Sequence, residues 1–342
     1  MAAAITEHVC KTPRHTTYYL ACGPANGPLV IFVHGWPEMS ISWRNQLSAL
    51  GALGFRAVAP DMRGYGRSTV HGQHADYSME QIVGDMRELL DHLRRDSAIW
   101  VGHDWGSPVV WSLASHHPET CPGLASLCVP YQPHGFSLAN LIPLLDRKLY
   151  PEDKFPAGQW DYHLYYEEHF DKATAAFEAN VLNTVKAMFR RGDPAAKGKP
   201  SMLSMIRRNG GWFGPAGQAP DLPLDRSVMS EQEMHQYAGA LERNGFFGPD
   251  SWYMNADRNT EYATRSVGGG RLSMPVLFMH AAYDYVCETV GSRLADPMRE
   301  ACTDLAEVTV NSGHWMAQEQ PEVVNAALVK WLATRFPALW PV

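Results

Sequence analysis

The chain has 342 residues, 45% of them hydrophobic, and a formal net charge of −7 at pH 7. This length suits one large α/β domain, with or without an inserted subdomain, and the composition is ample for a sizeable core. The acidic balance and the absence of a lysine and arginine run argue against a nucleic-acid partner and against an anionic membrane surface.

The first third of the chain alternates strand and helix patterns. Continuous apolar runs predict buried strands at residues 29–33, 56–61, 98–101 and 124–129. Apolar side chains recur at helical spacing over residues 77–94. Buried apolar strands separated by helices are typical of a parallel sheet that helices cover on both faces.

The pattern changes after residue 130. From 131 to about 270 the chain is rich in aromatic residues and proline, and helical spacing recurs over 162–189 and 231–244. A glycine- and proline-rich stretch at 192–224 shows no clear period, which is typical of a functional or mobile loop. These residues are predicted to form a helical cap inserted into the core.

The strand pattern resumes after the glycine run 268–270, which is typical of a hinge or of a solvated turn. Residues 275–280 and 305–310 are predicted strands, and 322–336 is a closing amphipathic helix. We therefore expect an α/β fold whose mostly parallel sheet carries an inserted cap. The expected boundaries are 1–130 for the first part of the core, 131–270 for the cap and 271–342 for the second part of the core.

Targeting signals are not evident in the sequence. The N-terminal residues lack a basic and an apolar region, and no apolar stretch is long enough to span a bilayer. The six cysteines have neither C-x-x-C spacing nor the density of a disulfide scaffold, which indicates thiols in a reducing compartment. The last residues carry no peroxisomal or reticulum-retention address. We expect a cytoplasmic protein without a membrane span, and homo-oligomerisation stays open.

Asp104 is the most informative residue, because it lies at the centre of Gly102-His103-Asp104-Trp105-Gly106 between a predicted strand and helix. The flanking glycines are typical of a tight strand-to-helix elbow, which leaves no room for side chains. An ionised carboxylate at the tip can attack an electrophilic carbon without an activating base, and the product is an alkyl-enzyme ester. The alternative is an aspartate that only caps the helix.

Two further polar residues follow late predicted strands. Asp284 comes after residues 275–280, and His314 comes after residues 305–310. Together with Asp104 they have the chain order nucleophile, acid, histidine. His314 would deprotonate a water that attacks the ester, and Asp284 would hold the imidazole tautomer. The alternative for His314 is a surface or core role, which most of the fifteen histidines would have. The alternative for Asp284 is an aspartate in a strand-end turn.

The ester chemistry develops an oxyanion, which needs hydrogen-bond donors. His34-Gly35-Trp36-Pro37 follows the strand 29–33, at the place where a loop amide can face the nucleophile. We assign the donors to the backbone amides of Trp36 and Trp105, and expect both residues to contact the substrate. The proline after Trp36 indicates a fixed turn, either trans or cis. The alternative is a simple strand-to-helix turn stiffened by Pro37.

Over residues 18–336 the sequence resembles the soluble α/β-hydrolase epoxide hydrolases. The segments that carry the resemblance are 34–38, 42–44, 61–68, 102–106, Asp284 and 313–315. Haloalkane dehalogenases share the aspartate nucleophile, so these segments do not separate the two families. The two cap tyrosines of the epoxide hydrolases do separate them.

The resemblance implies that Tyr162 and Tyr253 bind the epoxide oxygen and donate a proton to the leaving alkoxide. This agrees with the chemistry, because a strained ether leaves poorly without an acid whereas a halide needs none. We interpret Tyr165 and Tyr166 as packing residues or pocket wall. His163 stands where many relatives have glutamine, so the polarity beside Tyr162 departs from the family pattern.

The resemblance implies an epoxide hydrolase that converts small-molecule epoxides to vicinal diols without a cofactor or metal. One alternative is a haloalkane dehalogenase, in which N–H groups of Trp36 or Trp105 would hold the halide. Dehalogenases commonly have asparagine where this chain has Trp36. The other alternative is a non-catalytic ligand receptor built on a hydrolase scaffold, and the intact Asp104, Asp284 and His314 argue against it.

Overall fold

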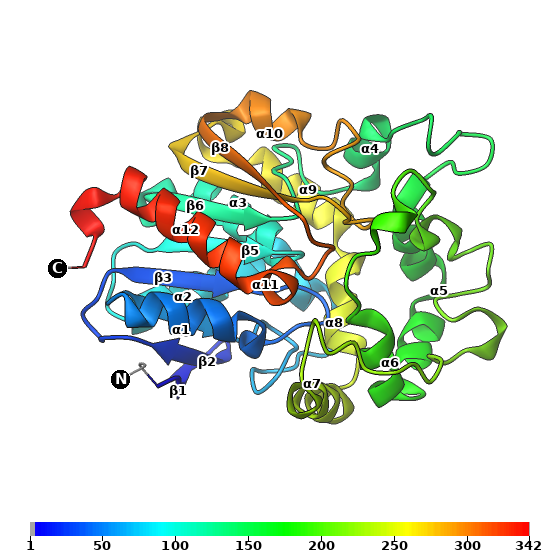
Figure 1. Cartoon of the computed structure of the whole chain (residues 1–342), viewed down its shortest axis with the longest axis horizontal. Helices are drawn as coiled ribbons and strands as arrows, with labels where there is room; N and C mark the ends of the chain where they lie inside the picture. Colours follow the sequence, from blue (N-terminus) through cyan, green and yellow to red (C-terminus); the bar gives the residue numbers. More distant parts are fainter. Residues whose placement is uncertain (1–3, 342) are drawn as a thin grey trace.

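The computed structural model describes residues 4–341, and Figure 1 shows a sheet with its helices beside a mainly helical part. Eight strands form one sheet in the order β1-β2-β4-β3-β5-β6-β7-β8. The strands are β1 (Thr6–Lys11), β2 (Thr16–Cys22), β3 (Leu29–Val33), β4 (Arg56–Pro60), β5 (Ile99–His103), β6 (Gly123–Leu127), β7 (Leu272–Ala281) and β8 (Cys302–Val310).

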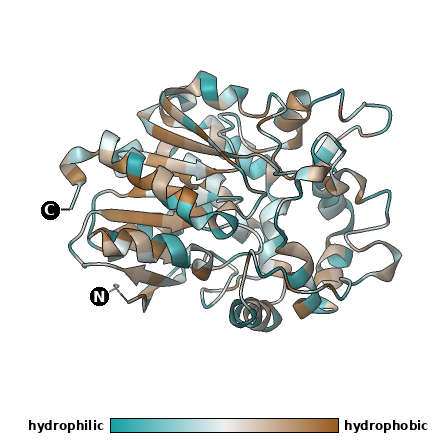
Figure 2. Cartoon of the chain, in the orientation of Figure 1, coloured by the Kyte–Doolittle hydropathy of each residue, from teal (hydrophilic) through white to brown (hydrophobic). Residues whose placement is uncertain are grey.

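The sheet is mostly parallel. Strand β2 pairs antiparallel with β1 and β4, and every neighbouring pair from β4 to β8 is parallel. Side chains of β3, β5 and β6 are buried along their whole length, and the apolar strands stand out in Figure 2. The prediction of a mostly parallel α/β sheet is therefore confirmed.

Helices cover both faces of this sheet. In Figure 1, α1 and α12 lie in front of the strands, and α1 contacts α11 and α12. On the other face, α2 packs against α3 and α9. The core helices are α1 (Arg44–Ala52), α2 (Met79–His92), α3 (Gly106–His116), α10 (Asp296–Ala301), α11 (Met316–Glu319) and α12 (Pro321–Arg335).

The chain leaves the sheet after β6 and returns at β7. The helices between these strands are α4 (Leu138–Leu141), α5 (Asp161–Glu178), α6 (Val181–Met188), α7 (Glu231–Asn244), α8 (Phe247–Ser251) and α9 (Ala256–Thr264). The helix predicted over 231–244 is α7. The helical stretch predicted over 162–189 is divided, because Asn180 caps a new helix by accepting a hydrogen bond from the Asn183 amide at 3.0 Å.

The two glycine-rich segments differ in structure. Residues 192–224 contain only short 3-10 turns, at Pro194–Ala196, Met202–Met205 and Gly214–Ala216. The glycines at 268–270 have φ angles of 63°, 65° and 78°, in the left-handed region that favours glycine. They form a turn that leads into β7.

Candidate active site

Asp104 lies at the elbow between β5 and α3. Its φ angle is 49°, a left-handed conformation that places the side chain beyond the end of the strand. A Cβ atom added to Gly106 would lie 2.0 Å from the Val33 carbonyl oxygen, and one added to Gly102 would lie 2.5 Å from the Gly106 carbonyl oxygen. Only glycine fits at either flanking position, since real Cβ atoms never approach so closely.

His314 and Asp284 lie next to this carboxylate. Their strands β8 and β7 are neighbours in the sheet, so the loops after them meet at its carboxyl edge. The His314 Nε2 atom is 3.5 Å from Asp104 Oδ2, and its Nδ1 atom is 3.0 Å from Asp284 Oδ2. The other oxygen of Asp284 accepts hydrogen bonds from the Val286 and Cys287 amides at 2.8 and 3.2 Å.

Neighbouring charges and hydrogen bonds shift the pKa values of His314 and Asp284 in the direction opposite to the effect of burial. Burial favours neutral His314, but the Asp284 carboxylate and the hydrogen bonds to both aspartates raise its pKa well above the ordinary value. Burial also opposes the ionisation of Asp284, but His314 and the two backbone amides lower the pKa of that carboxyl. The two aspartates therefore favour the protonated form of His314, and His314 in turn favours the ionised form of Asp284.

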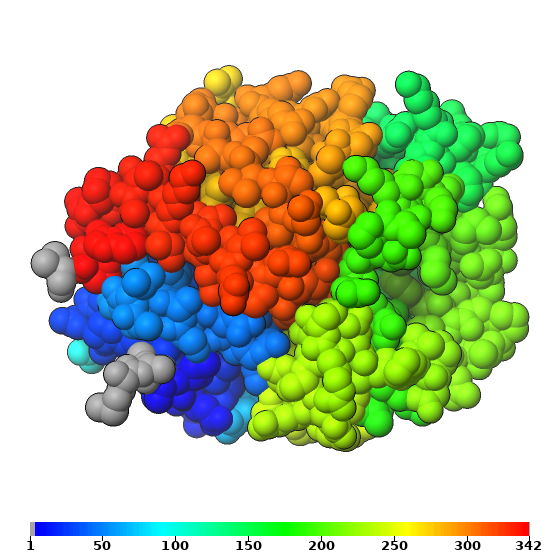
Figure 3. All heavy atoms as spheres, viewed as in Figure 1, coloured from blue at the N-terminus to red at the C-terminus, as the bar shows by residue number. Residues whose placement is uncertain are grey.

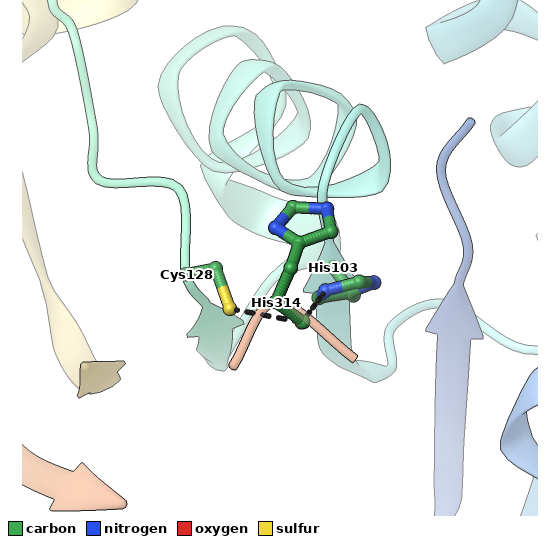
Figure 4. Close-up of side chains that lie close together, drawn as sticks. All are labelled: His103, Cys128 and His314. Carbon is green, nitrogen blue, oxygen red and sulfur yellow. Dashed lines mark hydrogen bonds between the residues drawn. The ribbon is translucent and has the colours of Figure 1, made fainter. Parts of the chain in front are cut away.

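Two buried side chains donate hydrogen bonds to the backbone carbonyl oxygen of His314. The His103 Nε2 atom donates to the His314 carbonyl oxygen at 2.7 Å, and the Cys128 thiol donates to the same oxygen at 3.4 Å (Figure 4). His103 also donates from Nδ1 to Glu38 at 2.7 Å. Burial disfavours the charged form of His103, but Glu38 raises its pKa to about 10, so both of its nitrogens carry protons.

This cluster resembles a metal site only in its residue types. The possible ligand atoms of His103, Cys128 and His314 lie within 4.8 Å of one another. However, His103 and Cys128 direct their N–H and S–H groups at a carbonyl oxygen, and His103 is protonated at both nitrogens. The arrangement therefore fits hydrogen bonding to the His314 carbonyl oxygen better than it fits metal coordination.

The loop after β3 faces the Asp104 carboxylate. The Trp36 amide donates to Asp104 Oδ1 at 2.6 Å, and the bond between Trp36 and Pro37 is cis. A Cβ atom added to Gly35 would lie 2.3 Å from Asp104 Oδ1 and 2.5 Å from the Trp105 amide nitrogen. The backbone of both predicted donor residues thus lies beside the Asp104 carboxylate, and the Trp36 amide donates the hydrogen bond.

Tyr162, at the start of α5, and Tyr253, after α8, face the same cavity. Their ring centroids are 5.7 Å apart, and both line a cavity of about 390 Å³ together with Trp36, Asp104 and His314. Burial raises the pKa of each phenol well above its ordinary value, so both keep their O–H donors near neutral pH. Figure 3 shows a hollow in the surface between green and yellow-green segments of the cap.

The neighbouring tyrosines have different surroundings. The Tyr166 ring stacks on Tyr253 with 4.5 Å between centroids, and its hydroxyl donates to Asp250 at 3.1 Å. Tyr165 is buried against the long loop, where a Cβ atom on Gly211 would lie 2.6 Å from its hydroxyl. Tyr165 is a packing residue, as the sequence indicated, whereas Tyr166 also forms part of a hydrogen-bond network.

Asp250 is the centre of that network and was not singled out from the sequence. It is fully buried and accepts hydrogen bonds from the Trp36 indole at 2.9 Å, Tyr166 at 3.1 Å and Thr174 at 3.1 Å. It therefore joins the loop after β3 to two cap helices. In the sequence, the signal that could have identified Asp250 is that it is a carboxylate within the apolar segment that precedes Tyr253.

Burial raises the pKa of Asp250 to about 7, although its three donors act in the opposite direction. A carboxyl whose pKa is higher in the folded state makes its full contribution to the free energy of unfolding at pH values below its pKa in the unfolded state. That stability is lost as the pH rises through the folded pKa. We therefore expect the Tm of the wild type to fall relative to that of Asp250→Asn between pH 4 and pH 8.

Differential scanning calorimetry of both proteins across this range measures the effect. One pKa unit corresponds to about 1.4 kcal/mol, so we expect the Tm difference to change by at least about 2 °C. The matched control is Asp257→Asn on α9, where the aspartate is exposed. Parallel Tm curves for the wild type and Asp250→Asn would contradict the assignment.

The fold, with its strand-to-helix elbow after β5, is that of an α/β hydrolase, and a family model described as alpha/beta hydrolase fold matches residues 28–321. Epoxide hydrolase A of Mycobacterium tuberculosis is 31% identical over 335 residues, covering 96% of this chain and 98% of the relative. The crystal structure of epoxide hydrolase A from Mycobacterium thermoresistibile matches with a TM-score of 0.78 and 29% identity, over 96% of this chain and 98% of that one.

Bifunctional epoxide hydrolase 2 of Sus scrofa is 32% identical over 310 residues, which are 90% of this chain. The chain spans about half of this longer relative, 52% of its length. The chain belongs to the epoxide hydrolases of the α/β-hydrolase fold, and the predicted family is confirmed. None of the helices within residues 4–341 is both long and apolar enough to cross a membrane.

Proposed function

We propose that this chain converts epoxides to vicinal diols through a covalent ester on Asp104. The observation that supports this most is the juxtaposition of Asp104 with His314 at 3.5 Å, in a cavity that Tyr162 and Tyr253 also line. A carboxylate nucleophile, a base and two phenol donors are the groups that this chemistry needs.

In the first step, Tyr162 and Tyr253 hydrogen-bond the epoxide oxygen while Asp104 attacks one ring carbon. A carbon–oxygen bond forms to the carboxylate, and the ring carbon–oxygen bond breaks. The alkoxide takes a proton from one tyrosine, because an alkoxide is more basic than a phenolate. The product is a hydroxyalkyl ester of Asp104.

In the second step, water attacks the ester carbonyl. Ester formation removes the negative charge of Asp104, which is one of the groups that raise the pKa of His314. The His314 imidazolium can then return a proton to the tyrosinate, which leaves a neutral imidazole. This imidazole accepts a proton from the attacking water, while Asp284 holds its orientation. The amides of Trp36 and Trp105 stabilise the oxyanion, and the diol leaves with an oxygen of the original carboxylate.

A single turnover in heavy-oxygen water tests the covalent step. With enzyme in excess over epoxide, we expect the label in the Asp104 carboxylate, because water attacks the ester carbonyl and not the epoxide. Mass spectrometry of the peptide that contains Asp104 measures it, and enzyme incubated without epoxide is the control. Label only in the diol, with Asp104 unlabelled, would point to direct hydrolysis.

We also propose that the cap, residues 131–270, encloses the substrate over the core parts 1–130 and 271–342. The loop 192–224 contributes to the cavity wall, since Ser201, Met202 and Leu203 line it. The expected substrate is a small-molecule epoxide with an apolar substituent in this cavity. The cytoplasmic location expected from the sequence is part of the same proposal.

A further inference from the structure

His163 follows Tyr162 on α5 and lies among aromatic rings beside the nucleophile. Its ring centroid is 4.5 Å from that of Tyr162 and 5.2 Å from that of Tyr253. Trp105 and Phe136 are each 6.3 Å away. The side chain is only 7% exposed. A polar ring thus occupies an otherwise apolar wall of the site.

The Nε2 atom of His163 is buried and has no hydrogen-bond partner among the residues that the structure describes. Buried polar atoms in native proteins are almost always paired, because an unpaired one loses its bond to water without replacement. Burial also lowers the pKa of His163 to about 3, despite the attraction of Asp104. The ring is neutral near pH 7 and has one donor nitrogen and one acceptor nitrogen.

His163 lines a second, small cavity of about 10 Å³, separate from the large one. Asp104, Tyr162 and Val286 line both cavities. The nucleophile therefore stands between a large apolar space and a space of about the size of one water molecule or hydroxyl group. An epoxide carbon at Asp104 would direct its two substituents toward these two spaces.

We propose that His163 is a specificity-determining residue whose Nε2 atom accepts a hydrogen bond from a hydroxyl on the short arm of the substrate. The substrate class is then a 2,3-epoxy alcohol whose long alkyl arm occupies the large cavity. This proposal rests on the proposed function, since it assumes attack by Asp104 on the oxirane. The hydroxyl would supply the partner that Nε2 lacks.

The test compares kcat/KM for trans-2,3-epoxyoctan-1-ol, its methyl ether and trans-2,3-epoxyoctane. The methyl ether keeps the inductive effect of the oxygen but has no O–H to donate, so it controls for intrinsic reactivity. We expect the wild type to prefer the alcohol over both others, by roughly 3–10-fold for one hydrogen bond. His163→Phe should abolish this preference, and His163→Gln should retain most of it because glutamine keeps a donor and an acceptor.

The wild-type comparison requires no variant, so a misfolded His163→Phe leaves the test intact. No preference for the alcohol in the wild type would overturn the proposal, as would an equal preference in wild type and His163→Phe with all three epoxides hydrolysed. Failure of the proposed function looks different, because the wild type would then hydrolyse none of the three epoxides.

Discussion

Replacing both Tyr162 and Tyr253 by phenylalanine should nearly abolish epoxide opening. One general acid typically contributes roughly 10²–10⁴-fold in rate, and two donors on one oxygen partly substitute for each other. Each single variant should therefore slow formation of the Asp104 ester, and the double variant should slow it far more. Stopped-flow measurement of ester formation in a single turnover gives these rates directly.

Tyr165→Phe is the matched control, because Tyr165 lies on the same helix but is not among the residues that line the large cavity. Tyr166→Phe is a less neutral comparison, since it removes a hydrogen bond to Asp250 and alters the ring stacked on Tyr253. A folded double variant that still opens epoxides would contradict the assignment. A wild type that releases halide faster than it makes diol would favour dehalogenase chemistry instead.

His314→Gln should separate the two steps of the reaction. The first step needs only the carboxylate and the tyrosines, so the variant should still open the epoxide. The second step needs a base, so the ester should accumulate and steady turnover should fall by roughly 10²–10⁴-fold. Intact-protein mass spectrometry detects the ester as an added mass equal to that of the epoxide.

The control for this prediction is His235→Gln on α7, an exposed histidine that is not among the residues that line the large cavity. It should turn over at the wild-type rate and trap no ester. If His314→Gln instead reached full steady turnover, His314 would not be the base. If the variant formed no ester at all, the histidine would be needed in the first step as well.

Several predicted features that rest on short stretches of sequence agree with the structure. Apolar runs such as 29–33 became buried strands, and the helix predicted over 231–244 has those bounds in α7. The edge strand β1 and its neighbour β2 were not predicted. Strand β1 is largely exposed and β2 has no clean alternation, so neither has the apolar pattern of a central strand.

The sequence by itself determined the parallel sheet, the elbow at Asp104 and the family, because each is recognised from short segments whose own residues lie close together in the chain. Only the tertiary structure decided that Asp250 binds the Trp36 indole and that His163 lines a second cavity. Strand and helix periods are local, whereas these contacts join cap to core across long stretches of chain. A buried carboxylate or imidazole therefore acquires its surroundings only when the two parts pack together.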